Sequence, residues 1–163
     1  MSNTNLSNRR LRLGMVGGGE GAYIGGIHRF AARLDNHYDL VAGAFDVDAE
    51  RGHSFAAKNF IDRDRSYGDY LAMVAGERAR DDRIDVVAIC TPNHTHFPIA
   101  KAFLEAGFDV ICEKPMTTTV EDAIALHDLA QATGRFLGVT YTYSGYPMIH
   151  EARAMVARGD LGK

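Results

Sequence analysis

Residues 11–28 read LRLGMVGGGEGAYIGGIH, and this stretch decides the fold. Apolar residues before the glycines predict a short buried strand: Leu11, Leu13, Met15 and Val16. Apolar residues after the loop recur at spacings of three and four: Ile24, Ile27, Phe30, Ala31 and Leu34. That spacing predicts one face of a helix. The stretch therefore predicts a strand that leads into a helix through a glycine loop.

A glycine loop between a strand and a helix is suited to binding phosphate. Glycine lets the backbone turn tightly and approach a ligand, and a helix N-terminus offers unpaired N–H groups and partial positive charge. The dinucleotide-binding fingerprint is present as Gly17-x-Gly19-x-x-Ala22, and Gly25 and Gly26 continue beyond it. Similar glycine strings occur in flexible loops and in methyltransferases, so the string alone leaves those alternatives open.

The rest of the chain alternates predicted strands with predicted helices. Strands are expected over residues 38–45, 84–90, 108–112 and 135–141. Helices are expected over residues 48–57, 69–74, 95–104, 119–130 and 149–157. A further short strand is possible before residue 69. The charged residues 75–83 are expected to form a solvated loop. This alternation predicts an α/β fold with a doubly wound parallel sheet between two helical layers, and a ligand at the carboxyl ends of the strands.

Length and composition limit the other possibilities. The 163 residues fit one domain, with 46% hydrophobic and 24% charged residues. The net charge of −3 argues against nucleic acid or an anionic membrane as a partner, and no apolar run approaches the roughly 20 residues of a membrane helix. Residues 1–10 are polar, unlike a secretory signal, and are expected to fray. Cys90 and Cys112 lie within apolar runs, which favours reduced core thiols in a cytoplasmic protein.

Three predicted strands are each followed by residues that suit a cofactor site. Asp46 follows the second strand, where a carboxylate can bind the adenosine ribose and disfavour a 2′-phosphate; a solvated turn is the alternative. The turn 91–93, Thr91, Pro92 and Asn93, follows the central strand and is expected to line the ribose and pyrophosphate, or else only to cap a helix. Arg51 keeps NADP open as the cofactor.

Histidines near these positions are assigned weaker roles. His94 and His96 have the spacing of a metal-binding pair, but no third ligand is apparent, so we expect no metal and a role at a helix N-terminus. His28, beside the glycines, is expected to be packed or hydrogen-bonded rather than catalytic.

The chain resembles the Gfo/Idh/MocA oxidoreductases, the group of glucose–fructose oxidoreductase and inositol dehydrogenase. The resemblance rests on ICTPNHTH at residues 89–96 and CEKP at residues 112–115, with the glycine loop and GVTYTY at residues 138–143. It extends from Leu11 to Lys163, but the loop at residues 17–25 is about two residues longer than the family's usual pattern.

The resemblance implies a Rossmann domain over residues 11–143 that binds NAD, with NADP possible. Members continue into a substrate domain that completes the active site, so residues 144–163 are expected to be a linker helix leading to a domain absent here. Lys114 matches the family lysine that assists proton transfer; a lysine paired with Glu113 is the alternative. The predicted cofactor-binding residues are Gly17, Gly19, Gly21, Ala22, Tyr23, Ile24, Asp46, Thr91, Pro92, Asn93, His96, Glu113, Lys114 and Tyr141.

Two functions follow from this resemblance. In the first, the chain is the dinucleotide-binding domain of an oxidoreductase that moves hydride between NAD(P) and the C–OH of a sugar, polyol or related alcohol. In the second, it is a dinucleotide-binding module without independent turnover. An apolar face around Lys114 and residues 141–147 is expected to favour self-association into a homo-oligomer. Tyr141 and Tyr143 fall where the family places cofactor- or substrate-facing residues, but core and interface packing explain them equally well. A SAM-dependent methyltransferase would leave Glu113-Lys114-Pro115 unexplained.

Overall fold

The computed structural model describes residues 9–162 and contains one five-stranded parallel sheet in the order β2-β1-β3-β4-β5. The strands are β1 (Leu11–Gly17), β2 (Tyr38–Ala44), β3 (Val86–Cys90), β4 (Asp109–Glu113) and β5 (Leu137–Thr140). The helices are α1 (Tyr23–Leu34), α2 (Ala49–Lys58), α3 (Tyr70–Arg78), α4 (His96–Glu105), α5 (Val120–Thr133) and α6 (Pro147–Arg158). Short 3-10 turns are η1 (Arg63–Arg65), η2 (Asn93–Thr95) and η3 (Thr142–Gly145). The predicted doubly wound Rossmann fold is confirmed.

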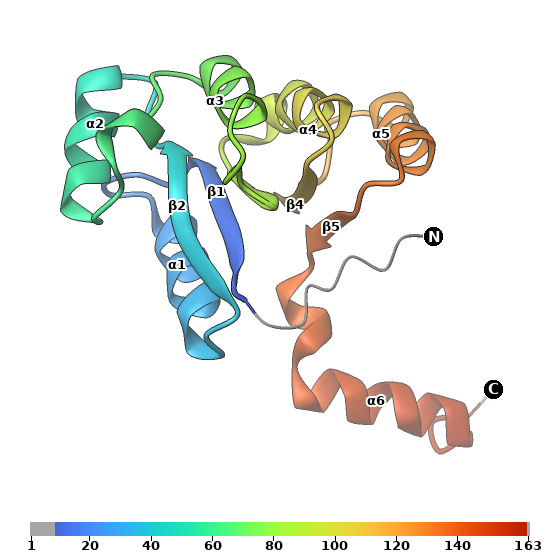
Figure 1. Ribbon diagram of the computed structural model, residues 1–163. Coiled ribbons are helices and arrows are strands. Elements are labelled where there is room, and N and C mark those ends of the chain that lie inside the picture. Colours follow the sequence, from blue (N-terminus) through green and yellow to red (C-terminus); the bar gives the residue numbers. More distant parts are fainter. Residues whose placement is uncertain (1–8, 163) are drawn as a thin grey trace.

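Helices cover both faces of the sheet (Figure 1). On one face, α3, α4 and α5 pack through side chains such as Met73, Phe103 and Leu126. On the other face, α2 packs through Phe55 against Met15 and Phe45, and α1 lies beside it. Every residue of β3 is buried, as expected of a central parallel strand covered on both sides. No helix within residues 9–162 is long and apolar enough to cross a membrane.

Helix α1 presents most of its apolar stripe away from the sheet, although Ile24 in its first turn packs against the core. Large side chains along the predicted face are exposed, Phe30 at 65% and Leu34 at 64%. The helix instead approaches the sheet through small residues, and Gly25 is its one buried residue. Periodicity located the helix, but glycine and alanine, which the pattern does not weigh, determine which side faces the core.

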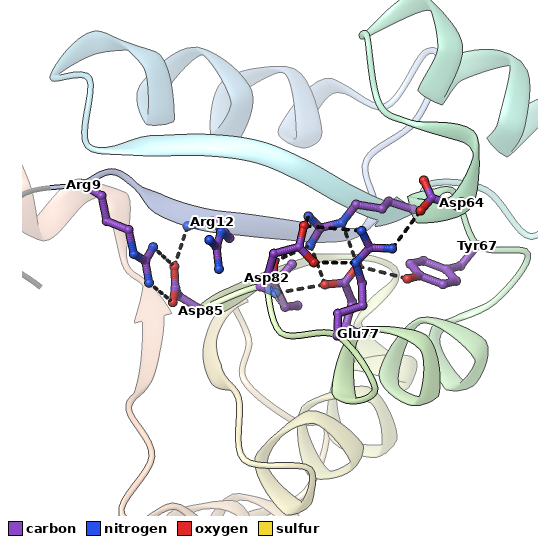
Figure 2. A network of polar contacts seen from close by, with 10 residues as sticks. Arg9, Arg12, Asp64, Tyr67, Glu77, Asp82 and Asp85 are labelled. Atoms are coloured by element: carbon purple, nitrogen blue, oxygen red, sulfur yellow. Dashed lines mark hydrogen bonds and ion pairs between the residues drawn. The ribbon is translucent and has the colours of Figure 1, made fainter. Parts of the chain in front are cut away.

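The charged segment 75–83 is not the solvated loop that was expected. Helix α3 continues to Arg78, and Glu77 is fully buried. Figure 2 shows why: the Glu77 carboxylate accepts hydrogen bonds from Arg65 at 2.6 and 3.1 Å, from Tyr67 at 3.0 Å and from the Ile84 amide at 2.9 Å. A buried carboxylate with these partners is compensated, whereas an isolated one is not. The optional strand before residue 69 is absent; Ser66 makes only one bridge, to Gly43.

The N-terminal tail expected to fray lies mostly outside the described residues. Arg9 and Arg10 are the first residues that the structure describes. The Arg9 guanidinium donates hydrogen bonds of 2.7 and 2.8 Å to the Asp85 carboxylate (Figure 2). Arg10 pairs with Asp39 at 2.7 Å. These two residues are therefore tied to the body of the domain. Both cysteines are buried free thiols, and burial raises the pKa of each to about 12, which confirms them as inert core residues.

Candidate functional site

A cleft of about 920 Å³ opens at the carboxyl ends of the strands, where the fold predicts a ligand. Eight of the predicted site residues line it: Tyr23, Ile24, Thr91, Asn93, His96, Glu113, Lys114 and Tyr141. Tyr143, for which a cofactor- or substrate-facing role and simple packing were both left open, also lines it, and four further residues were not predicted: Ile27, Thr142, Ser144 and Tyr146. The last three belong to the segment after β5, so their place behind the last parallel strand was the available signal.

The glycine loop lies next to this cleft and joins β1 to α1. Gly17 and Gly18 have φ of +73° and +70°, a conformation that favours glycine. A Cβ at Gly18 would lie 2.9 Å from the Gly25 Cα, so strand end and helix approach each other through two bare backbones. Gly18 was missing from the predicted set. The predicted residues Gly17, Gly19, Gly21 and Ala22 shape the loop but do not line the cleft.

The N-terminus of α1 carries free donor groups. Ala22 is the N-cap, its side chain offers no hydrogen bond, and the first turn contains no acidic residue. The first N–H groups of a helix have no partner within the helix. Since Tyr23 and Ile24 also line the cleft, this end of α1 can receive an anion.

Asp46 lies beyond the end of β2 and outside the 920 Å³ cleft. Its Oδ1 accepts the Asp48 N–H at 2.9 Å, and its Oδ2 accepts Nη2 and Nε of Arg51 at 2.6 and 3.1 Å. The hydrogen bond from the Asp48 amide, followed by that from Arg51, lowers the pKa of Asp46. The carboxylate thus stays ionised. The preceding residue, Phe45, accepts the Gly19 N–H at 3.2 Å, which places Asp46 beside the glycine loop.

His96 joins two of the turns that line the cleft. The imidazole is fully buried, with Nδ1 2.7 Å from the Pro115 carbonyl oxygen and Nε2 2.9 Å from the Thr91 carbonyl oxygen. Thr95 Oγ1 lies 2.7 Å from both Thr91 Oγ1 and the Pro92 carbonyl. His96 therefore acts as a brace. Within residues 9–162 no three His, Cys, Asp or Glu side chains are grouped to hold a metal.

Glu113 forms the back of the cleft. Its Oε1 lies 2.8 Å from His28 Nε2 and accepts the Thr140 hydroxyl at 2.6 Å, and its Oε2 accepts the Lys114 N–H at 3.2 Å. Burial acts to raise the pKa of Glu113, but hydrogen bonds from Thr140 and His28 outweigh it and lower the pKa. His28 is thus hydrogen-bonded, as expected.

Lys114 follows Glu113 and precedes a cis peptide bond to Pro115. Its side chain is exposed and lines the cleft. The alternative of an ion pair with Glu113 does not hold among the described residues: the Glu113 carboxylate instead contacts His28 Nε2 and the Thr140 hydroxyl. The ammonium group therefore faces the cleft, where a ligand would meet it.

Comparisons with known proteins agree with this geometry. Residues 11–141 match the GFO_IDH_MocA family, described as an oxidoreductase family with an NAD-binding Rossmann fold. The uncharacterized oxidoreductase YfiI of Bacillus subtilis is 46% identical over 158 residues, which span 96% of this chain and 40% of YfiI. D-xylose 1-dehydrogenase (NADP(+)) of Hypocrea jecorina is 31% identical over 130 residues, spanning 78% of this chain and 32% of that enzyme.

A solved structure is similar over almost the whole chain. The inositol dehydrogenase homolog of Azotobacter vinelandii, in complex with NADH and myo-inositol, superposes with a TM-score of 0.93 at 47% identity, covering 96% of this chain and 41% of the homolog. The chain thus spans about 40% of the length of the relatives that it matches over nearly its whole length.

Proposed function

Because the chain belongs to the Gfo/Idh/MocA oxidoreductase family, we propose that it binds NAD and is the dinucleotide-binding part of an enzyme that oxidises or reduces a sugar, polyol or related alcohol. One observation carries this proposal. The end of α1, the Thr91 turn and Lys114 come from distant parts of the chain, and they meet around one cleft at the carboxyl ends of the strands.

The glycine loop fits the pyrophosphate of a dinucleotide. A Cβ at Gly19 would lie 2.6 Å from the Phe45 carbonyl oxygen, and one at Gly18 would lie 3.0 Å from the Met15 sulfur. The loop therefore has to present bare backbone, which is what close contact with phosphate needs. We assign the pyrophosphate to Gly17, Gly19, Gly21, Ala22, Tyr23 and Ile24, where Gly19 allows close approach but does not donate its N–H, which Phe45 holds.

Asp46 favours NAD over NADP. Its ionised carboxylate can accept hydrogen bonds from ribose hydroxyls and would repel a 2′-phosphate. Arg51 is the cation at this position, but it interacts with the negative charges of three carboxylates: Asp46, Asp48 and Glu20. The surroundings of Arg51 therefore oppose a second phosphate, and NADP remains the alternative only if Arg51 leaves Asp46.

Lys114 is the proposed catalytic residue. When bound, the nicotinamide supplies the hydride chemistry. Lys114 Nζ would bind the substrate oxygen: as the neutral amine it would take the hydroxyl proton during oxidation, and as the ammonium it would return a proton during reduction. Thr91, Pro92, Asn93, His96, Glu113 and Tyr141 would orient the cofactor beside it. Glu113 leaves the lysine free for this task because its own partners are His28 and Thr140.

The substrate class is inferred from relatives such as the D-xylose dehydrogenase and the inositol dehydrogenase homolog. The selecting residues would come from a second domain, to which residues 144–163 would lead. A dinucleotide-binding module without turnover of its own is the second candidate. It is favoured by the exposure of Tyr141 (63%) and Tyr143 (75%) on the cleft rim, which leaves one wall of the cleft open. The unpaired buried thiols favour the cytoplasm.

Calorimetric titration of the chain with NAD and NADP tests this proposal. We expect NAD to bind more tightly, and Asp46→Ala to weaken NAD by about tenfold while NADP binding is unchanged or improved, because a charge-assisted hydrogen bond is lost. Asp39→Ala, which removes a carboxylate at the opposite end of β2, is the matched control and should leave both affinities unchanged. Absence of binding by the unaltered chain would refute the proposal.

A further inference from the structure

Arg29 extends from the middle of α1 back to the glycine loop. Its Nη1 donates a hydrogen bond to the Gly18 carbonyl oxygen and lies 3.7 Å from the Met15 sulfur. The guanidinium carbon lies 4.8 Å from the centre of the Phe55 ring. The side chain is partly buried, and these contacts from β1 and α2 fix its position.

The hydrogen bond from Arg29 helps to hold the Gly18–Gly19 peptide group in one orientation. The peptide that joins Gly18 to Gly19 is trans, so its carbonyl and its N–H point in opposite directions. Arg29 holds the carbonyl on one side, and the Phe45 carbonyl accepts the Gly19 N–H at 3.2 Å on the other. Gly25 packs against Gly18 from α1. The plane of this peptide is therefore held at both ends.

The orientation of this peptide matters for the donors beyond it. Gly19 cannot donate to a ligand while Phe45 holds its N–H, so an anion has to be received by the later part of the loop and the first turn of α1. Those donors follow directly from the fixed peptide. If this peptide flipped, the Gly18 carbonyl oxygen would turn toward the side on which the anion binds. This oxygen is a hydrogen-bond acceptor and would repel phosphate.

Arg29 also places a cation under the loop. Burial lowers the pKa of its guanidinium, but the normal pKa of arginine is so high that the group remains charged. A positive charge behind the donors attracts an anion in front of them.

We propose that Arg29 is a positioning residue for the pyrophosphate of the dinucleotide, acting through the Gly18–Gly19 peptide. This inference rests on the proposed function. Arg29 contacts the phosphate-binding loop and does not touch Asp46, the proposed adenosine-binding residue. Loss of the Arg29 side chain should therefore affect only ligands that carry a pyrophosphate.

The test compares three ligands with Arg29 variants of the chain. Arg29→Met keeps an unbranched apolar stem but removes the donors and the charge. We expect NAD and ADP, titrated by calorimetry, to bind about tenfold more weakly, and adenosine, titrated by NMR, to bind as before. Arg29→Lys restores a donor and the charge and should recover most of the loss. Arg33→Met removes the same charge one turn later on α1 and should leave all three affinities unchanged.

Each outcome separates this inference from the proposed function. If the unaltered chain binds neither NAD nor ADP, the proposed function fails and this inference with it. If it binds them and Arg29→Met weakens adenosine by the same factor, or weakens nothing, Arg29 has only a packing role and the inference is wrong. Should Arg29→Met not fold, Arg29→Gln, which has no charge and whose amide nitrogen ends two bonds short of the arginine Nη, takes its place with the same selective loss expected.

Discussion

The Nδ1 atom of His96 lies 2.7 Å from the carbonyl oxygen of Pro115, and this contact ties the turn after β4 to the turn after β3. These are the turns that carry Lys114 and Asn93 into the cleft. The geometry of the site thus depends on a buried side chain that has no room for a ligand of its own.

Replacement of His96 by alanine should therefore loosen both turns. It removes the imidazole that contacts the Thr91 and Pro115 carbonyls, to one of which a neutral ring donates its N–H, and opens a cavity, so we expect a loss of about 3 kcal/mol in the free energy of unfolding. Urea denaturation measures this loss. His94→Ala, at an exposed position two residues away, should change stability by less than about 0.5 kcal/mol. Equal effects of the two substitutions would contradict the role of His96 as a brace.

The buried Glu77–Arg65 pair should be among the most sensitive ion pairs. Glu77→Gln leaves the Arg65 guanidinium, 6% exposed, with only the half-exposed Asp82 carboxylate at 3.4 Å as counter-charge, and should cost about 3–5 kcal/mol. Glu105→Gln, in the exposed pair with Lys101, is the control and should cost less than about 0.5 kcal/mol. The double change Glu77→Leu with Arg65→Met should regain much of the loss, since both charges are then removed. A double variant no more stable than Glu77→Gln would show that packing, not charge, dominates.

Glu113 should make stability depend on pH in the acidic range. Its pKa in the folded chain lies below the ordinary 4.5. The contribution to stability is therefore complete above the unfolded pKa and is lost as the pH falls through the folded pKa. We expect the urea midpoint of the unaltered chain to decrease from about pH 6 to about pH 3, and Glu113→Gln to have a shallower decrease. Glu121→Gln, at an exposed position on α5, should keep the original slope; a Glu113→Gln slope equal to it would refute the prediction.

Self-association should depend on the cleft rim. Exposed apolar residues gather there from α1 and from the segment after β5, and contiguous apolar surface of this kind marks interaction sites. Light scattering at high concentration should detect a homo-oligomer, and Tyr143→Ser should weaken it. Val47→Ser, at a fully exposed position beyond β2, should not. A chain that is monomeric at every concentration would contradict this prediction.

The sheet and most helix limits were predictable because local patterns specify them. Apolar runs located the strands, and two helices start where the sequence predicts, capped by Asp48 and Thr119, which accept the amides of Arg51 and Asp122. The burial of Glu77 was not predictable, since its partners Arg65 and Tyr67 are brought to it by tertiary contacts that carry no periodic signal. Burial, followed by the charge of Glu77, raises the pKa of Tyr67 to about 12, which reflects the same hidden network.

The candidate site was predictable to a similar degree. Motifs at strand ends identified Thr91, Asn93 and Lys114 because parallel strands bring their carboxyl ends together. The pairing of Glu113 with His28 rather than with Lys114 depends on how α1 brings His28 to the carboxyl end of β4, which no motif describes. The role of Arg29 could not be predicted for the same reason, since its hydrogen-bond partner is a main-chain carbonyl eleven residues earlier.

Helix α6 has 12 residues, buries none of them, and extends away from the sheet beyond β5 (Figure 1). A helix of this length is only marginally stable in water without packing. The hydrogen bonds of α6 are therefore sensitive to contact with another surface. Slow amide hydrogen exchange along α6 would show that another surface covers the helix, without a label and without knowledge of what that surface is.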